Sequence, residues 1–197
     1  MLSASGFVSL ASDQLRIGRC HYSRVRQRSR GVQRNKTLSS KPTQLYVIHI
    51  MSKSHAIDVA AYILRKLGPT SAMKLQKLVY YSQAWATVWD DEAVFDDEIE
   101  AWANGPVVRS LYAQHRQQFI LDEKTFQGAN IERISAKHRE TIDIVLDTYG
   151  KKSAQWLSDQ THAESPWIEA RNGLSETQRG DTTISLASIS EYYSSLN

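Results

Sequence analysis

The chain has 197 residues, of which 41% are hydrophobic and 23% charged, so it is long enough to form one globular domain with a core. Its net charge of +3 is unevenly distributed. Residues 1–50 carry nine basic and one acidic residue (+8), whereas residues 51–197 carry fifteen basic and twenty acidic residues (−5). The overall basic charge is therefore no argument for nucleic-acid binding by the body. The sequence lacks any run of about 18 apolar residues, and its single cysteine, Cys20, excludes an internal disulfide.

Residues 1–50 differ from the rest because they are rich in Arg, Ser and Gln and lack a sustained apolar period, which is typical of disorder. A basic arm for nucleic acid or acidic lipid and an organelle transit peptide are both open interpretations. A secretory signal is disfavoured because no apolar segment precedes a cleavage site. The stretch MSKSHAIDVAAYIL at 51–64 is typical of a protein start. We therefore favour residues 1–50 as spurious upstream sequence and residues 51–197 as the domain.

Apolar residues at helical spacing predict a first helix over 55–67, which Gly68 and Pro69 end. A long aromatic helix follows over 72–89, capped by Thr70 or Ser71, and the short link favours a helical hairpin. Residues 90–102 hold seven acidic residues in thirteen. This segment is too interrupted for a long helix, and we expect a loop with a short β-hairpin around 93–103.

The helical pattern returns at Pro106, which is expected at the first position of a helix because that position needs no N–H. Residues 122–134 are predicted to form a loop around Gly128. Further helices are expected over 135–149, 153–162, 166–172 and 185–196. The sequence thus predicts a compact, mainly α-helical single domain of about six helices.

Catalytic and metal-binding motifs are absent from the sequence, which has no HExxH, CxxC, GxSxG, P-loop or GxGxxG pattern. The four histidines of the body, His55, His115, His138 and His162, are far apart in the sequence. We therefore expect no catalytic residue, metal or cofactor. A hydrolase using His162 with an acidic partner is kept as an alternative, which requires both groups to line one pocket.

Acidic and aromatic side chains are the conspicuous features of the body. The carboxylates of residues 90–100 are predicted to form a solvated acidic rim that suits a basic protein partner. Tyrosine and tryptophan, which dominate protein interfaces, exceed what a small helical core needs. The predicted rim consists of Asp90, Asp91, Glu92, Asp96, Asp97, Glu98 and Glu100.

Three motifs stand in order along the body: KLQKLVYYSQAW at 74–85, FDDEIEAWANGPVVRSLY at 95–112 and LSDQTHAESPWIEAR at 157–171. With these motifs the body resembles the Panacea domain, the SocA-like antitoxin family of bacteria and their phages, over about 51–197. The resemblance implies a small, helical, cytoplasmic protein that is not an enzyme. It also implies a partner, a protein toxin encoded nearby that the antitoxin binds and neutralises, and in at least one branch delivery of that toxin to a AAA+ protease.

The resemblance also marks positions that contact the toxin or hold the fold. We expect Lys74, Gln76 and Lys77 at the surface, and Leu75, Leu78 and Val107 in the core. We expect the corner at Gly105 and Pro106 to be structural and to set the geometry of an interface. The alternative function is a nucleic-acid-associated regulator that uses residues 1–50, since the body is not expected to bind nucleic acid or membrane. The candidate toxin-binding positions are Lys74, Gln76, Lys77, Tyr80, Tyr81, Trp85, Trp102, Gly105, Pro106, Tyr112, His162 and Trp167.

Overall fold

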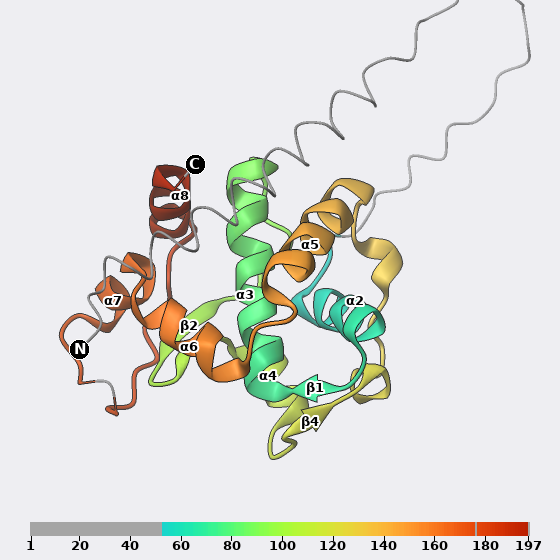
Figure 1. Ribbon diagram of the computed structural model, residues 1–197, viewed down its shortest axis with the longest axis horizontal. Helices are drawn as coiled ribbons and strands as arrows, with labels where there is room; N and C mark the ends of the chain where they lie inside the picture. Colours follow the sequence, from blue (N-terminus) through green and yellow to red (C-terminus); the bar gives the residue numbers. More distant parts are fainter. Residues whose placement is uncertain (1–52, 176, 197) are drawn as a thin grey trace, which may run out of the picture.

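A computed structural model describes residues 53–175 and 177–196, and these residues form a mainly α-helical domain (Figure 1). The predicted mainly α fold is confirmed, with seven α-helices in the described part in place of about six. The expectations for residues 1–50 and for a start at Met51 lie outside the described residues. No helix in the described part combines the length and the apolar character needed to cross a membrane.

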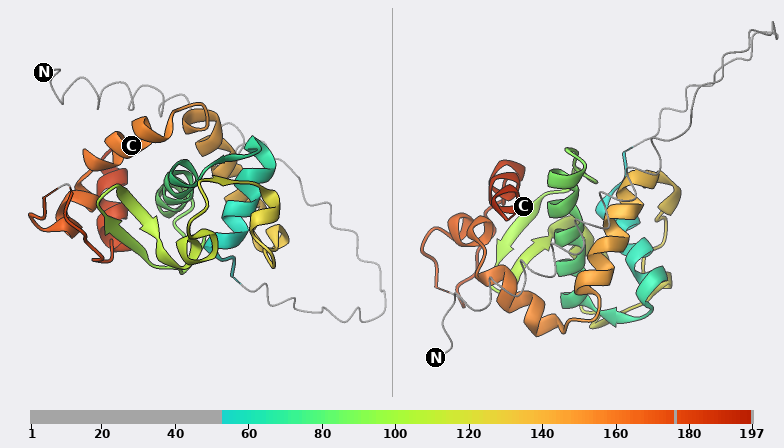
Figure 2. Two further views of the ribbon diagram at one scale, coloured as in Figure 1. Left: turned by 90° about the horizontal axis from the view of Figure 1, so that it is seen from below. Right: turned by 45° about the horizontal axis from the view of Figure 1, so that its top comes forward.

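Helix α3 (Ala72–Trp89) runs through the middle of the domain, and the other elements surround it (Figures 1 and 2). Every residue from 75 to 86 is buried, as expected of a helix that packs on all sides. The helices that pack on it are α2 (Ala56–Leu67), α5 (Ala136–Tyr149), α6 (Ala154–His162) and α8 (Leu186–Ser195). The short helix α7 (Ser165–Arg171) packs against α6 and α8.

Serine caps begin four of these helices, because the serine hydroxyl accepts a hydrogen bond from an N–H of the first turn that has no partner within the helix. The cap at Ser71 was one of the two expected from the sequence, and the other three caps are the first residues of predicted helical ranges: Ser135, Ser153 and Ser185. Helix α2 differs, since its cap is His55. The hydroxyl of Ser54 instead donates to the carbonyl of Val94, 2.6 Å away.

A β-hairpin lies against α3, formed by β2 (Ile99–Trp102) and β3 (Gly105–Val108) around the two-residue turn 103–104. A hairpin was expected near this place, but it lies later in the chain than 93–103. The expected helix start at Pro106 is wrong, since α4 (Arg109–His115) begins three residues later. The buried, β-branched Val107 and Val108 extend the strand instead.

The register of the hairpin explains why a proline fits in β3. Pro106 lies opposite Ala101. The N–H of Ala101 points away from β3, toward the carbonyl of Thr182 at 2.9 Å. Pro106 is therefore in a pair that exchanges no hydrogen bond within the hairpin, and its missing N–H leaves no gap in the ladder. The carbonyl of Pro106 is likewise directed out of the hairpin, toward α3.

A second, smaller sheet pairs β1 (Thr70–Ser71) with β4 (Ile120–Leu121) in antiparallel fashion. It joins the beginning of α3 to the segment after α4, at the bottom of the view in Figure 1. Two short 3-10 helices, Glu123–Thr125 and Ile131–Arg133, connect β4 to α5 and pack on α2.

Candidate interaction site

The polar side chains of the first motif hold the hairpin and α5 against α3. The amide of Gln76 pairs with the backbone of Val108: its Oε1 accepts from the Val108 N–H at 2.9 Å and its Nε2 donates to the carbonyl at 3.4 Å. Lys77 Nζ donates to the carbonyl of Pro106 at 3.0 Å. Lys74 Nζ donates to the carbonyl of Gly150 at the end of α5, at 2.7 Å. The motif thus binds backbone groups of the hairpin and of the end of α5.

The expectation that Gln76 and Lys77 lie at the surface is wrong, because they are only 3% and 1% exposed. Long polar side chains are retained inside the domain where they meet backbone groups that need partners. Lys74 is half-buried. Leu75, Leu78 and Val107 are buried, as expected of core residues.

Because Gly105 has no side chain, the ammonium group of Lys77 can occupy the space beside it. A Cβ atom on Gly105 would lie 2.6 Å from Lys77 Nζ and 2.6 Å from Thr161 Oγ1, closer than real contacts allow. The φ angle of Gly105 is +95°, in the region that favours glycine. Burial lowers the pKa of Lys77 to about 7, because no water solvates its ammonium group. The glycine of the second motif and the lysine of the first are therefore parts of one packing unit.

The third motif holds the other strand and the turn of the hairpin. Ser158 donates to the carbonyl of Asn104 at 3.0 Å, and Trp167 Nε1 donates to the carbonyl of Trp102 at 2.9 Å. Arg171 donates to the carbonyl of Ala101 at 3.1 Å. The ring of His162 stacks on Trp167, with centroids 4.2 Å apart. All three sequence motifs consequently meet at the hairpin.

Glu164, which the sequence did not single out, joins three helices through its carboxylate. Tyr81 of α3 and Tyr193 of α8 donate to its two oxygens, at 3.0 and 2.7 Å. Burial raises the pKa of Glu164 to about 7, and the two tyrosine hydrogen bonds counteract only part of that shift. A carboxylate just before a proline-started helix gives no sequence signal of burial, so only the three-dimensional packing reveals it.

The tyrosine and tryptophan candidates divide into core and surface residues. Tyr80, Tyr81 and Trp85 are fully enclosed around Tyr193. Trp102 and Tyr112 are half-buried, and their rings meet edge to face with centroids 4.8 Å apart. Aromatic positions that can touch a partner are therefore found on the hairpin and α4, and not on α3.

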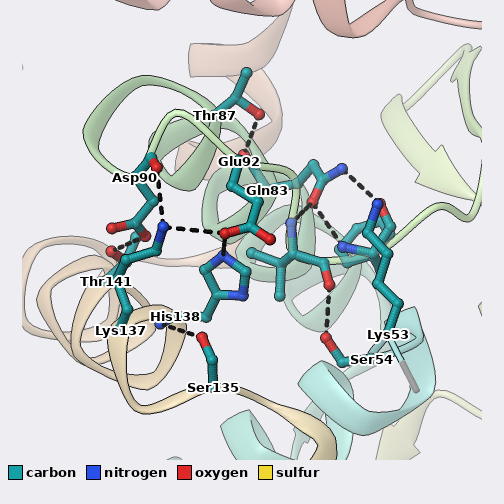
Figure 3. A network of polar contacts seen from close by, with 12 residues as sticks. Lys53, Ser54, Gln83, Thr87, Asp90, Glu92, Ser135, Lys137, His138 and Thr141 are labelled. Carbon is teal, nitrogen blue, oxygen red and sulfur yellow. Dashed lines mark hydrogen bonds and ion pairs between the residues drawn. The ribbon is translucent and has the colours of Figure 1, made fainter. Parts of the chain in front are cut away.

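Residues 90–100, named here the acidic segment, are tied to the domain by their own backbone (Figure 3). Gln83 of α3 accepts from the N–H of Val94 at 2.9 Å and donates to the carbonyl of Phe95 at 2.9 Å. Glu92 pairs with Lys137 at 3.0 Å and lies 3.8 Å from His138, both on α5. Basic side chains of the same chain thus compensate part of the acidic charge.

The prediction of a solvated rim is wrong at two of its positions, Asp90 and Glu100, which are buried. Thr141 donates to the carboxylate of Asp90 at 2.7 Å. Glu100 accepts from Trp102 Nε1 at 2.7 Å and pairs with Arg109 at 3.3 Å. These two carboxylates can be buried because hydrogen-bond donors of the same domain surround them. Asp91, Glu92, Asp96 and Glu98 are exposed, and Asp97 is half-buried.

The hairpin and α4 form a surface that we call the hairpin face, made of Trp102, Asn104, Arg109 and Tyr112. Asn104 and Arg109 are exposed, and the two half-buried rings of Trp102 and Tyr112 flank them in the sequence. The backbone below is fixed by Gln76, Lys77 and Trp167. A search of the described residues finds no group of three or more metal-ligating side chains. The arrangement is that of an aromatic contact surface on a rigid support.

Comparison with protein families gives the class of protein that the chain resembles. Residues 75–168 match the family model described as antitoxin SocA-like, Panacea domain. This segment of the chain is similar to that family, and the resemblance stated from the three motifs is confirmed. The matched segment contains the whole hairpin and four of the residues that hold it, which are Gln76, Lys77, Ser158 and Trp167, whereas Arg171 lies beyond it. No curated protein and no solved structure matches the chain.

Proposed function

We propose that the protein is an antitoxin that binds a cognate protein toxin and neutralises it by covering the toxin's functional surface. The observation that carries this proposal is the match of residues 75–168 to the SocA-like antitoxin family. Neutralisation by binding requires a partner surface and no chemistry.

The hairpin face is the contact surface that we propose for the toxin. Trp102 and Tyr112 present large, partly exposed rings, and such residues contribute most binding energy in protein interfaces. Their backbone is fixed by buried hydrogen bonds, so binding would order little of the chain and lose little entropy. The exposed carboxylates Asp91, Asp96 and Glu98 would attract a basic toxin surface.

The test is co-expression in bacteria of this chain with each gene encoded beside it. One neighbour is expected to be toxic alone and harmless together with this protein, and the two proteins are expected to co-purify. If no neighbouring gene is toxic alone and rescued, the proposal fails. Delivery to a AAA+ protease is the finer proposal: the toxin is then expected to disappear faster in the presence of this protein, and only in cells that contain the protease.

A further inference from the structure

The loop that leads into β4 exposes two adjacent apolar side chains. Phe119 is 84% and Ile120 66% exposed, more than any other large hydrophobic residue that the structure describes. Ile120 is the first residue of β4 and Phe119 directly precedes it, and β4 lies at the bottom of the domain in Figure 1. Exposed neighbouring apolar residues of this size commonly mark an interaction site.

This loop is held in an unfavourable backbone shape. Gln117 has a φ of 69°, a left-handed conformation that costs a residue with a side chain about 1–2 kcal/mol. The turn is closed by a hydrogen bond of 2.9 Å from the N–H of Gln118 to the carbonyl of His115. The His115 ring is buried and lies 3.1 Å from the amide of Gln76. The turn and the buried His115 ring therefore hold the backbone that leads to Phe119 in a fixed position.

One edge of β4 is open. The carbonyl of Phe119 accepts from the N–H of Ala72, and Leu121 lies opposite Thr70 in β1. In an antiparallel pair the residue between them, Ile120, directs its N–H and carbonyl to the other side. In the described residues no further strand pairs with β4 on that side. Such an edge can accept an added strand.

Uncompensated charge beside this edge is positive. Arg116 and Lys124 are exposed and make no ion pair within the described residues. Of the two nearby acids, Glu123 pairs with Arg65 at 2.6 Å, whereas Asp122 only accepts from the backbone N–H of Lys124 at 3.0 Å and keeps its negative charge. Against Asp122, Arg116 and Lys124 leave the edge positive on balance. Although residues 51–197 are acidic overall, this edge presents free cations.

We propose that the open edge of β4 is a docking site for an extended, acidic and apolar segment of a partner protein. The segment adds as a strand to Ile120, packs its apolar side chains on Phe119 and Ile120, and places carboxylates near Arg116 and Lys124. This site is built from residues other than those of the hairpin face, so it does not depend on the proposed toxin contact.

The test uses a fluorescent twelve-residue peptide that alternates valine with glutamate, titrated into the full chain and followed by anisotropy. A matched peptide that alternates valine with lysine is expected to bind at least about tenfold more weakly, because its charge opposes Arg116 and Lys124. The double variant F119S/I120S is expected to weaken the glutamate peptide at least about tenfold, because two apolar contacts are lost. I168S, which changes an exposed apolar residue on α7, away from this edge in the sequence, is the control and should bind as the wild type does.

Strand addition is tested with a glutamate peptide whose valine nitrogens are methylated, which removes the N–H donors on one edge and is expected to abolish binding. The proposal is overturned if the wild type does not bind the glutamate peptide, or binds the lysine peptide equally well. It is also overturned if F119S/I120S or methylation leaves the affinity unchanged. Because Phe119 and Ile120 are exposed, the double variant should keep the wild-type melting temperature, and circular dichroism checks that it is folded.

Discussion

At the scale of single residues, the packing of Gly105 against Lys77 is the contact on which the hairpin depends. Lys77 reaches the carbonyl of Pro106 across the place where a Gly105 side chain would lie. Lys77 is 1% exposed, and this burial lowers its pKa to about 7. A methyl group at position 105 must therefore displace either the lysine or the hairpin.

We expect Gly105→Ala to lower the free energy of unfolding by about 3 kcal/mol, since backbone strain and a steric clash add together. Gly128→Ala is the matched control: Gly128 has a φ of +89° but nothing within 4 Å of an added Cβ. That control should lose only about 1 kcal/mol, the cost of the left-handed backbone. Urea denaturation measures both. Equal losses in the two variants would show that Lys77 and Thr161 yield without cost.

The raised pKa of Glu164 predicts how the stability of the domain depends on pH. Its pKa rises from 4.5 in the unfolded chain to about 7 in the folded protein, so the folded state holds this proton more tightly. The resulting stabilisation is complete below pH 4.5 and is lost as the pH rises through 7. Glu164→Gln has no such titration. The melting temperature of this variant minus that of the wild type is expected to rise by about 5 °C between pH 5 and pH 8.

Calorimetry at pH 5, 6, 7 and 8 measures this difference. Burial also lowers the pKa values of His115 and His138, but both histidines titrate in the variant and the wild type alike, so their contribution cancels. A difference that stays constant over this range would mean that the protonation of Glu164 does not change on folding.

At the scale of elements, the side-chain amide of Gln76 joins α3 to the last residue of the hairpin, beside the bond that Lys77 makes to Pro106. Gln76 supplies both a donor and an acceptor to Val108, as a neighbouring strand would. Gln76→Leu keeps the bulk of the side chain but leaves the buried N–H of Val108 without a partner. We expect a loss of about 2–3 kcal/mol. Faster hydrogen exchange is expected at the Val108 amide, with α5 unchanged.

Gln155→Leu is the control for this substitution, because Gln155 is exposed and bonds only to Asp159 on its own helix. Its stability should stay within about 0.5 kcal/mol of the wild type. If Gln76→Leu behaves like this control, other contacts hold the hairpin and the amide pairing is dispensable.

The helices could be predicted from the sequence, whereas the hairpin's partners could not. Serine caps and apolar periods are local signals, so Ser71 and Ser135 marked helix starts correctly. The expected helix start at Pro106 was wrong because a proline is equally suited to the first position of a helix and to a strand position whose N–H makes no hydrogen bond to the neighbouring strand. Gln76 and Lys77 were expected at the surface because their backbone partners lie about 30 residues away in the sequence. The burial of Glu164 depends in the same way on α8.

At the scale of the whole molecule, Gln76 lies between two surfaces. Through Val108 it supports the hairpin face, and through His115 it supports the loop that exposes Phe119. Both surfaces are fixed by the same buried amide, although they carry different chemistry: aromatic rings with acids nearby on one, apolar side chains with free cations on the other. One buried amide thus contacts the supports of both proposed surfaces.

The hairpin face yields the last prediction, which uses the toxin that co-expression identifies. Tyr112→Ala removes a half-exposed ring that packs on Trp102, and we expect toxin affinity to fall at least about tenfold because aromatic contacts dominate interfaces. Trp156→Ala is the matched control, since Trp156 is also half-buried but packs near Tyr149 and Lys152 on another part of the domain. Isothermal titration calorimetry measures affinity, and melting temperatures check folding. Equal losses of affinity in the two variants would place the toxin elsewhere, whereas a loss confined to Tyr112→Ala at a retained melting temperature would place it on the hairpin face.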